Sequence, residues 1–295
     1  MGYALTAIAD DAFANYYNCA GLVYLGSPTI TASYLGYLCN LWLDAHYAYL
    51  AISYPVGNSG LGFDFTFFTP DEAEKRDSLG HYLGTERVWR IAPRISYARR
   101  LIDRLSLGVA WKYIHERYHG DPYWWGGWYD SRGVSWAFDF NVLYKPLENL
   151  SIGAVLHNIG PNIKYTMSGA TDPLPRLTRV ALAYVPSDNR YIKCTLCIEI
   201  TKILVGMFAD EDNTFWQNMK YELDAAWKGF GLELLCYRVF SLRGGYFYDF
   251  EGRRDGFTFG LGAQIKGFAL DIGIDEVIFD FPTQNRTVSV SYRFN

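Results

Sequence analysis

The sequence alternates apolar and polar residues with period two along most of its length, and this pattern constrains the fold more than any other feature. Near the C-terminus, Val288, Val290, Tyr292 and Phe294 share one face of an extended segment, while the residues between them are polar. Alternation of this regularity predicts β-strands with one apolar face. About fourteen such segments follow one another, the first two less clearly, near residues 29–38, 43–54, 61–67, 89–97, 105–113, 135–145, 150–157, 177–185, 191–201, 230–237, 240–248, 257–265, 268–275 and 287–294.

Composition narrows the class of protein. Half of the residues are apolar and 18% are aromatic, yet no run of about eighteen apolar residues exists, so a membrane-spanning helix is not expected. The lack of a long apolar run does not argue against a transmembrane β-barrel, because only every second residue of each strand faces lipid. The net charge of −4 is evenly spread, so nothing points to a nucleic-acid partner. The five cysteines are scattered and odd in number, so no disulfide framework is expected.

The lengths of the connections separate a barrel from a soluble β-sandwich, which also alternates. Outer-membrane barrels combine tight periplasmic turns with long outer loops. One set of connections is short, at 55–58, 101–104, 146–149, 186–190, 238–239 and around 266. The other set is long apart from its first member near 39–42, and comprises 70–87, 117–133, 158–176, 202–229, 249–256 and 276–286.

Aromatic residues lie on the apolar face at both ends of the strands, as in the two interfacial girdles of a membrane barrel. The polar face carries charges of both signs, with Arg94, Lys112 and Arg243 beside Asp64 and Asp139, which predicts a wet or ion-paired lumen. We therefore expect an all-β fold, a transmembrane antiparallel β-barrel of about fourteen strands. The girdle residues are Trp89, Tyr113, Trp136, Tyr248 and Phe257 at the long-loop ends, and Tyr97, Tyr144, Tyr184, Tyr292 and Phe294 at the short-turn ends.

The lumen of such a barrel is too wide for its own side chains to fill, so it is either open or plugged. Residues 1–28 precede the first strand and are the candidate plug. We expect two parts, an N-terminal plug segment at 1–28 and the transmembrane barrel at 29–295. Met1-Gly2-Tyr3 lacks the basic and apolar regions of a signal peptide, so an exported protein would be a trimmed form.

One helix is expected in a long outer loop, between Thr214 and Gly229. Thr214 and Gln217 have capping-box spacing, and Gly229 is a suitable end. The apolar residues at helical intervals are Phe215, Trp216, Met219, Leu223 and Ala226. The helix is either a lid packed on the barrel rim, which is the simpler interpretation, or a docking surface for a partner.

An outer loop at 123–129 holds five aromatic residues around two glycines. An exposed apolar patch of this kind marks contact with a partner or ligand. The alternative is that the rings fold onto the rim or the plug. The candidate partner-binding aromatics here are Tyr123, Trp124, Trp125, Trp128 and Tyr129.

No motif supports catalysis. His115-Glu116-Arg117-Tyr118-His119 matches the zinc-peptidase pattern, but that chemistry needs a helix and the motif continues a strand. Cys194 and Cys197 have the spacing of a redox pair, but on a strand their sulfurs point to opposite faces. We expect no enzyme, no catalytic residue, no metal site and no cofactor.

Three pairs of stretches carry a resemblance to a known family. GYALTAIADD at 2–11 precedes NCAGL at 18–22, HNIGPNIK at 157–164 precedes LPR at 174–176, and LRGGY at 242–246 precedes FTFGLG at 257–262. In this order they resemble the PorV/PorQ-like outer-membrane proteins, relatives of the FadL-type transporters. Cys19 stands where that family has proline. The residues that match its N-terminal motif are Asp10, Asp11, Asn18, Ala20 and Gly21.

The resemblance implies a FadL-like barrel with an N-terminal plug, in the bacterial outer membrane and in contact with its lipid. It implies a non-enzymatic part in type IX protein secretion, with the C-terminal domains of secreted cargo proteins, the translocon and the cell-surface sortase as partners. The alternative is a FadL-like transporter or channel for hydrophobic small molecules, with a hydrophobic ligand. A purely structural barrel is a third possibility.

Overall fold

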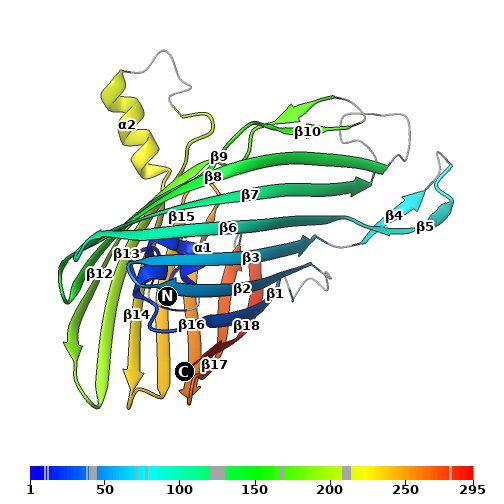
Figure 1. The fold of residues 1–295 in the computed structure, drawn as a ribbon. Helices are drawn as coiled ribbons and strands as arrows, with labels where there is room; N and C mark the ends of the chain where they lie inside the picture. Colours follow the sequence, from blue (N-terminus) through cyan, green and yellow to red (C-terminus); the bar gives the residue numbers. More distant parts are fainter. Residues whose placement is uncertain are drawn as a thin grey trace.

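The computed structural model describes residues 1–9, 11, 13–37, 39, 45–70, 72–76, 79–119, 130–166, 169–207, 214–278 and 281–294. In this part of the chain, fourteen antiparallel strands close into a barrel (Figure 1). Each pairs with the next along the chain, and the last closes on the first. They are β1 (Thr29–Gly36), β2 (His46–Val56), β3 (Ser59–Thr69), β6 (Trp89–Ile102), β7 (Leu105–His119), β8 (Asp130–Leu147), β9 (Leu150–Ile159), β12 (Leu177–Asp188), β13 (Ile192–Ile203), β14 (Trp227–Cys236), β15 (Phe240–Asp249), β16 (Arg254–Ile265), β17 (Phe268–Ile278) and β18 (Phe281–Arg293).

Shorter elements decorate this ring. A hairpin of β4 (Glu72–Arg76) and β5 (Tyr82–Arg87) forms its own two-stranded sheet beyond the wall (Figure 1). The strands β10 (Ile163–Tyr165) and β11 (Thr171–Asp172) extend the main sheet next to β8. The helices are α1 (Ala14–Tyr17), the 3-10 helix η1 (Cys19–Tyr24) and α2 (Phe215–Asp224). Within the described residues, no helix has the length and apolar character needed to cross a membrane.

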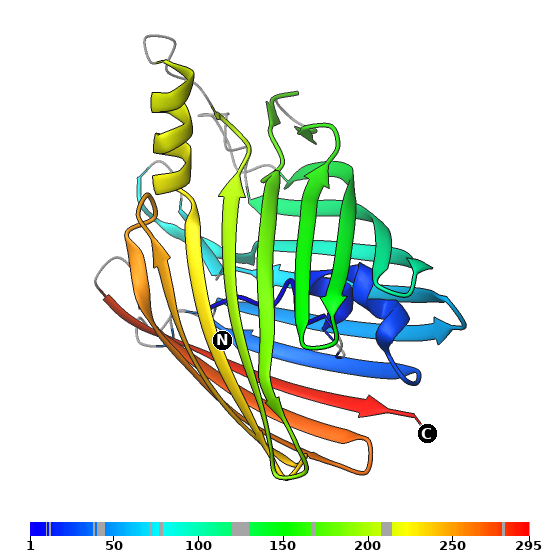
Figure 2. The same ribbon diagram turned by 90° about the vertical axis from the view of Figure 1, so that its left-hand side faces the viewer.

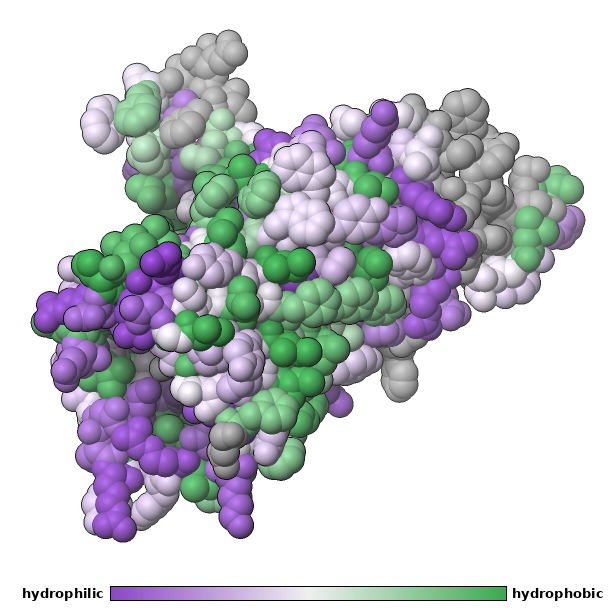
Figure 3. Space-filling view, in the orientation of Figure 1, coloured by the Kyte–Doolittle hydropathy of each residue, from purple (hydrophilic) through white to green (hydrophobic). Residues whose placement is uncertain are grey.

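The two faces of the wall differ as the alternation predicts. Phe63 on β3 is 45% exposed, whereas its neighbour Asp64 is 1% exposed. The same contrast separates Ile95 from Ser96 on β6. Because the exposed residues are apolar and the buried ones polar, the outer surface suits lipid and the inner surface suits a polar interior. Figure 3 shows hydrophobic side chains over the wall and hydrophilic ones at the short turns of its lower end.

The short turns lie where the sequence predicts them, but several outer connections do not have the predicted length. The predicted long loops at 249–256 and 276–286 are wrong: β15 runs to Asp249 and β16 starts at Arg254, while β17 runs to Ile278 and β18 starts at Phe281. In both places the two strands stay paired with each other beyond the predicted strand ends. The residues there do not alternate clearly between apolar and polar side chains, so the pattern does not predict them as strands. The first outer connection, predicted to be short, spans 37–45.

The predicted helix is also too long. Helix α2 has the predicted capping box, in which the Thr214 side chain accepts from Gln217 N and the Gln217 side chain accepts from Thr214 N. It ends at Asp224 rather than at Gly229, because Trp227 already pairs with Thr201 on β13. Strand pairing therefore overrides the helical spacing of the last turn.

Candidate functional site

Residues 1–28, called the N-terminal segment here, cross the inside of the barrel and hydrogen-bond to its inward face. The backbone N–H groups of Leu5 and Thr6 both donate to Glu199 Oε2 on β13, at 3.0 Å each. At its start, Gly2 N donates to Thr258 Oγ1 on β16 at 2.8 Å. Figure 2 shows this segment enclosed by strands on several sides. A carboxylate that accepts two backbone N–H groups forms strong, charge-assisted hydrogen bonds.

Asn18 links two parts of the N-terminal segment to the wall. Its side chain is fully buried, and Nδ2 donates to Thr6 O and to Val142 O on β8, at 2.9 Å each. Its Oδ1 accepts from Ala20 N at 3.1 Å, so the same residue caps η1. Cys19 N donates to Asn141 Oδ1 at 3.2 Å. The amide of asparagine has both donors and acceptors, which explains why this residue type suits the position.

A charged network on the inward face holds the middle of the segment. Arg94 on β6 donates from Nε to Asp64 Oδ2 at 2.8 Å and from Nη1 to Asp139 Oδ2 at 3.3 Å. Its third nitrogen, Nη2, donates to Asn15 O of the segment. Lys112 Nζ lies 2.8 Å from Asp139 Oδ2. The predicted ion-paired lumen is therefore present, and its cations and carboxylates neutralise one another around the segment.

Inward-facing glycines let the segment approach the backbone of the wall. A Cβ at Gly62 would lie 1.9 Å from Asn15 Oδ1, and one at Gly108 would lie 2.6 Å from Cys19 Sγ. Real Cβ atoms do not come this close to other atoms, so a side chain at Gly62 would displace the Asn15 side chain, and one at Gly108 would also meet Ala20 N at 2.7 Å. The other wall glycines in close contact with the segment are Gly60, Gly153, Gly229, Gly231 and Gly245. Gly62 and Gly108 alternate with apolar neighbours along their strands, so the sequence indicates that they lie on the polar face but not what they contact.

The HNIGPNIK stretch marks the point where β10 replaces β9 as the partner of β8. Asn158 has φ 61°, a left-handed conformation, and its N–H donates to Asp139 Oδ1 at 2.8 Å. Beyond this break, Ile163 is buried with Leu174 against the inward-facing Ala137. The stretch therefore builds an apolar cluster at the outer end of the lumen, above the charged network. The motif can be recognised from its residues alone, but the apolar cluster that it builds cannot.

Helix α2 stands at the outer end of the barrel, above β14 (Figure 2). Phe215 and Trp216 are 60% and 77% exposed, and Met219 is half-buried. The buried contact of the helix is polar, because Glu222 Oε2 lies 2.6 Å from Lys202 Nζ on β13. Phe215 and Trp216 thus do not pack on the rim as an apolar lid would require.

The other residues predicted for the N-terminal motif and the outer loops do not share one environment. Ala20 and Gly21 are buried in η1, and a Cβ at Gly21 would lie 1.8 Å from Ala9 O. Asp11 is exposed and its Oδ1 accepts from Phe13 N. The residues outside the described part of the chain are Asp10, Tyr123, Trp124, Trp125, Trp128 and Tyr129.

The motifs set aside in the sequence lie as expected. His115 to His119 lie on β7, an extended strand. On β13, Cys197 is buried on the inward side, while Cys194 is not. Among the described residues, no group of three or more histidine, cysteine or acidic side chains is arranged to hold a metal ion.

A protein-family model matches more than half of this chain. Residues 1–210 match the family model of the type IX secretion system protein PorV. The chain belongs to the PorV family. No curated protein matches this PorV-family chain.

Solved structures of similar fold are FadL-family outer-membrane barrels. The toluene transporter TodX of P. putida aligns with a TM-score of 0.59 at 12% identity, over 96% of this chain and 94% of TodX. The Ralstonia pickettii toluene transporter TbuX gives a TM-score of 0.56 at 14% identity, over 96% of this chain and 93% of TbuX. A Pseudomonas aeruginosa FadL homologue gives a TM-score of 0.55 at 11% identity, over 100% of this chain and 96% of the homologue. At these identities the likeness shows the fold alone, an antiparallel β-barrel of the FadL type.

Proposed function

We propose that this PorV-family barrel takes part in type IX secretion by binding the C-terminal domains of cargo proteins, and translocon and sortase partners, at its outer face. The observation that carries the proposal is the exposed aromatic pair on α2. Trp216 is 77% exposed and Phe215 is 60% exposed at the outer end of the barrel. Tryptophan and other aromatics dominate the binding energy of many protein interfaces.

The anchoring of α2 supports a docking surface rather than a lid. Glu222 and Lys202 form a buried ion pair at one side of the helix, and Tyr221 Oη donates to Glu251 at 2.9 Å. These polar contacts hold the helix while its aromatic side chains stay exposed. A helix held in this way presents its anchors with little conformational freedom left to lose on binding.

The interior supports protein docking over solute transport. The N-terminal segment is joined to the lumen wall by hydrogen bonds from several strands, chiefly to Arg94 and Glu199, and Asp139 pairs with Arg94 behind it. Small-molecule sites are predominantly apolar, and the space around these groups is charged and hydrogen-bonded. We propose that the segment acts as a plug, so that the alternative of a hydrophobic-solute channel through the lumen is disfavoured.

The test compares Trp216→Ala with Lys220→Ala in cells that express the full chain. Both positions lie on α2 and are exposed, so neither change should disturb the barrel. Loss of an aromatic hot spot costs about 2 kcal/mol or more, which is roughly 30-fold in Kd. We expect W216A to lose most of the cargo domain that co-purifies with wild type, and K220A to keep it. Equal cargo recovery by W216A and wild type would contradict the role of α2.

A second measurement addresses the transporter alternative. Purified protein is reconstituted into vesicles, and entry of a hydrophobic solute such as toluene is followed. The proposal predicts the same rate as in protein-free vesicles. A faster, saturable entry that a lumen substitution abolishes would favour transport instead.

A further inference from the structure

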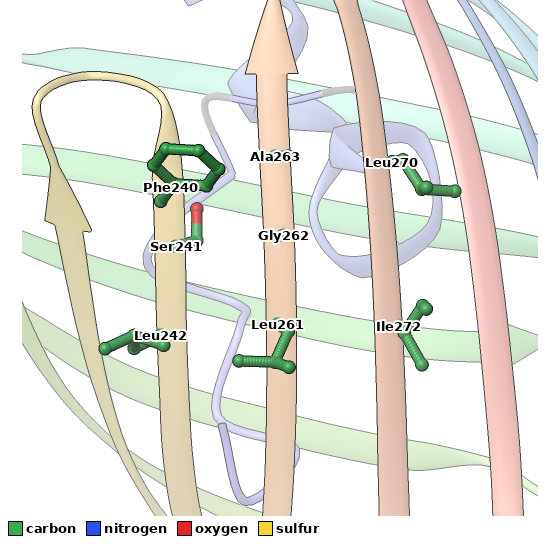
Figure 4. Close-up of a pocket in the computed structure, with 8 residues that line it drawn as sticks. All are labelled: Phe240, Ser241, Leu242, Leu261, Gly262, Ala263, Leu270 and Ile272. Atoms are coloured by element: carbon green, nitrogen blue, oxygen red, sulfur yellow. The ribbon is translucent and has the colours of Figure 1, made fainter.

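The lipid-facing wall is hollowed where β14 to β17 pass side by side. Two hollows of about 280 and 440 Å³ open on the outer surface and share Leu242 and Leu261 as lining. Figure 4 shows the first hollow on strands β15 to β17, with the N-terminal segment behind the wall. Its apolar lining includes Phe240, Leu270 and Ile272.

Small outward residues create these hollows. Ala263 on β16 lies between Phe240 on β15 and Leu270 on β17 in the strand register. Gly244 on β15 pairs with Phe259, and a Cβ built at Gly244 would meet no atom within 4 Å. At Ala263 and at Gly244, large outward side chains on the neighbouring strands therefore surround a residue with a small side chain or none.

The first hollow begins at the short-turn end of the barrel. Phe240 is the first residue of β15, directly after the turn at 237–239. Short turns of outer-membrane barrels face the periplasm, and the periplasmic leaflet consists of phospholipid. The exposed Lys266 lies in the next short turn, three residues beyond Ala263. At about 3.3 Å per residue, this places its Cα roughly 10 Å from that of Ala263, on the headgroup side of the hollow.

We propose that these hollows seat an acyl chain of a periplasmic-leaflet phospholipid, whose phosphate pairs with Lys266. Burial from water does not favour this site over bulk lipid, because both surroundings are apolar. The binding free energy comes from closer van der Waals contact at Ala263 and Gly244 and from the attraction between the phosphate and the Lys266 ammonium. The bound lipid would span three residue steps of β16, from Ala263 to Gly260, which is roughly 10 Å.

Native mass spectrometry of the protein, extracted from outer membranes in mild detergent, tests this proposal. We expect wild type to retain one phospholipid through delipidation. Ala263→Trp fills the first hollow and should lower the retained fraction at least tenfold. Lys266→Gln should lower it several-fold without filling any hollow. Ala32→Trp is the matched control, because Ala32 is an exposed outward residue on β1 between Leu50 and Val290, and it should leave retention unchanged.

Heat-modifiable migration on gels shows whether each variant still forms the barrel, so a folding defect is distinguished from lost lipid. Equal retention by Ala263→Trp and wild type would overturn the proposal, as would equal loss in Ala32→Trp. Wild type that retains no phospholipid, or only lipopolysaccharide, would also overturn it.

Discussion

Replacing Asn18 by alanine is expected to release the N-terminal segment while the barrel stays folded. Asn18 makes three hydrogen bonds with the backbone groups Thr6 O, Val142 O and Ala20 N. Each buried group left without its partner costs about 1–3 kcal/mol. The total is therefore about 3–9 kcal/mol, and even the lower limit shifts the ratio of docked to released segment by more than about 100-fold. The strand ladders do not depend on this side chain.

The buried thiol of Cys19 reports on this release. Cys19 is 1% exposed, so a thiol reagent reaches it only when the segment leaves the wall. With the other four cysteines replaced by alanine, labelling of Cys19 should be at least about 100-fold faster in Asn18→Ala than in wild type. Asn149→Ala, in the exposed turn between β8 and β9, is the control and should not change the rate. Equal labelling rates in Asn18→Ala and wild type would refute the reasoning.

Three further predictions concern the same segment and α2. Gly62→Val should prevent docking and expose Cys19 to labelling, because its Cβ would collide with Asn15 Oδ1. Burial raises the pKa of the Cys19 thiol to about 12, so between roughly pH 8.5 and 12 the released segment loses a proton that the docked one keeps. Docking should therefore weaken by up to about tenfold per pH unit across that window, measured by amide hydrogen exchange of the segment, and Cys19→Ser should abolish the dependence. Glu222→Gln removes the negative charge that pairs with Lys202. Because breaking a buried ion pair costs about 3–5 kcal/mol, hydrogen exchange of the α2 amides should become faster, while hydrogen exchange of the strand amides should not change.

Strand alternation is sufficient to predict the barrel from sequence because lipid and lumen impose opposite demands on neighbouring residues. Phe63 and Asp64 illustrate this, since one is exposed to the outside and the other is buried inside. The capping box of α2 was equally predictable, because Thr214 and Gln217 interact within one turn. Local signals of this kind need no knowledge of the rest of the fold.

Features that depend on distant contacts could not be predicted. The end of α2 is set by the pairing of Trp227 with Thr201 on β13, which outweighs the helical spacing. The path of the N-terminal segment is set by Glu199 and Arg94, which are more than seventy positions away from the backbone groups they bind. An inward glycine such as Gly62 can be read from the sequence pattern, but its partner cannot. Gly62 and Gly153 lie against the segment, whereas the inward glycines Gly260, Gly262 and Gly273 contact only neighbouring strands, so glycine on the polar face does not by itself predict a contact with the segment.

Site-directed spin labelling of β17 tests most directly whether the apolar face meets lipid. Labels are placed one at a time from Phe268 to Ile274, and their collision rates with oxygen and with a water-soluble nickel chelate are measured in a reconstituted bilayer. High oxygen accessibility is expected at Phe268, Leu270, Ile272 and Ile274, and low oxygen accessibility at Ala269, Asp271 and Gly273. Uniform accessibility along the strand, or the opposite phase, would contradict the assignment of the two faces.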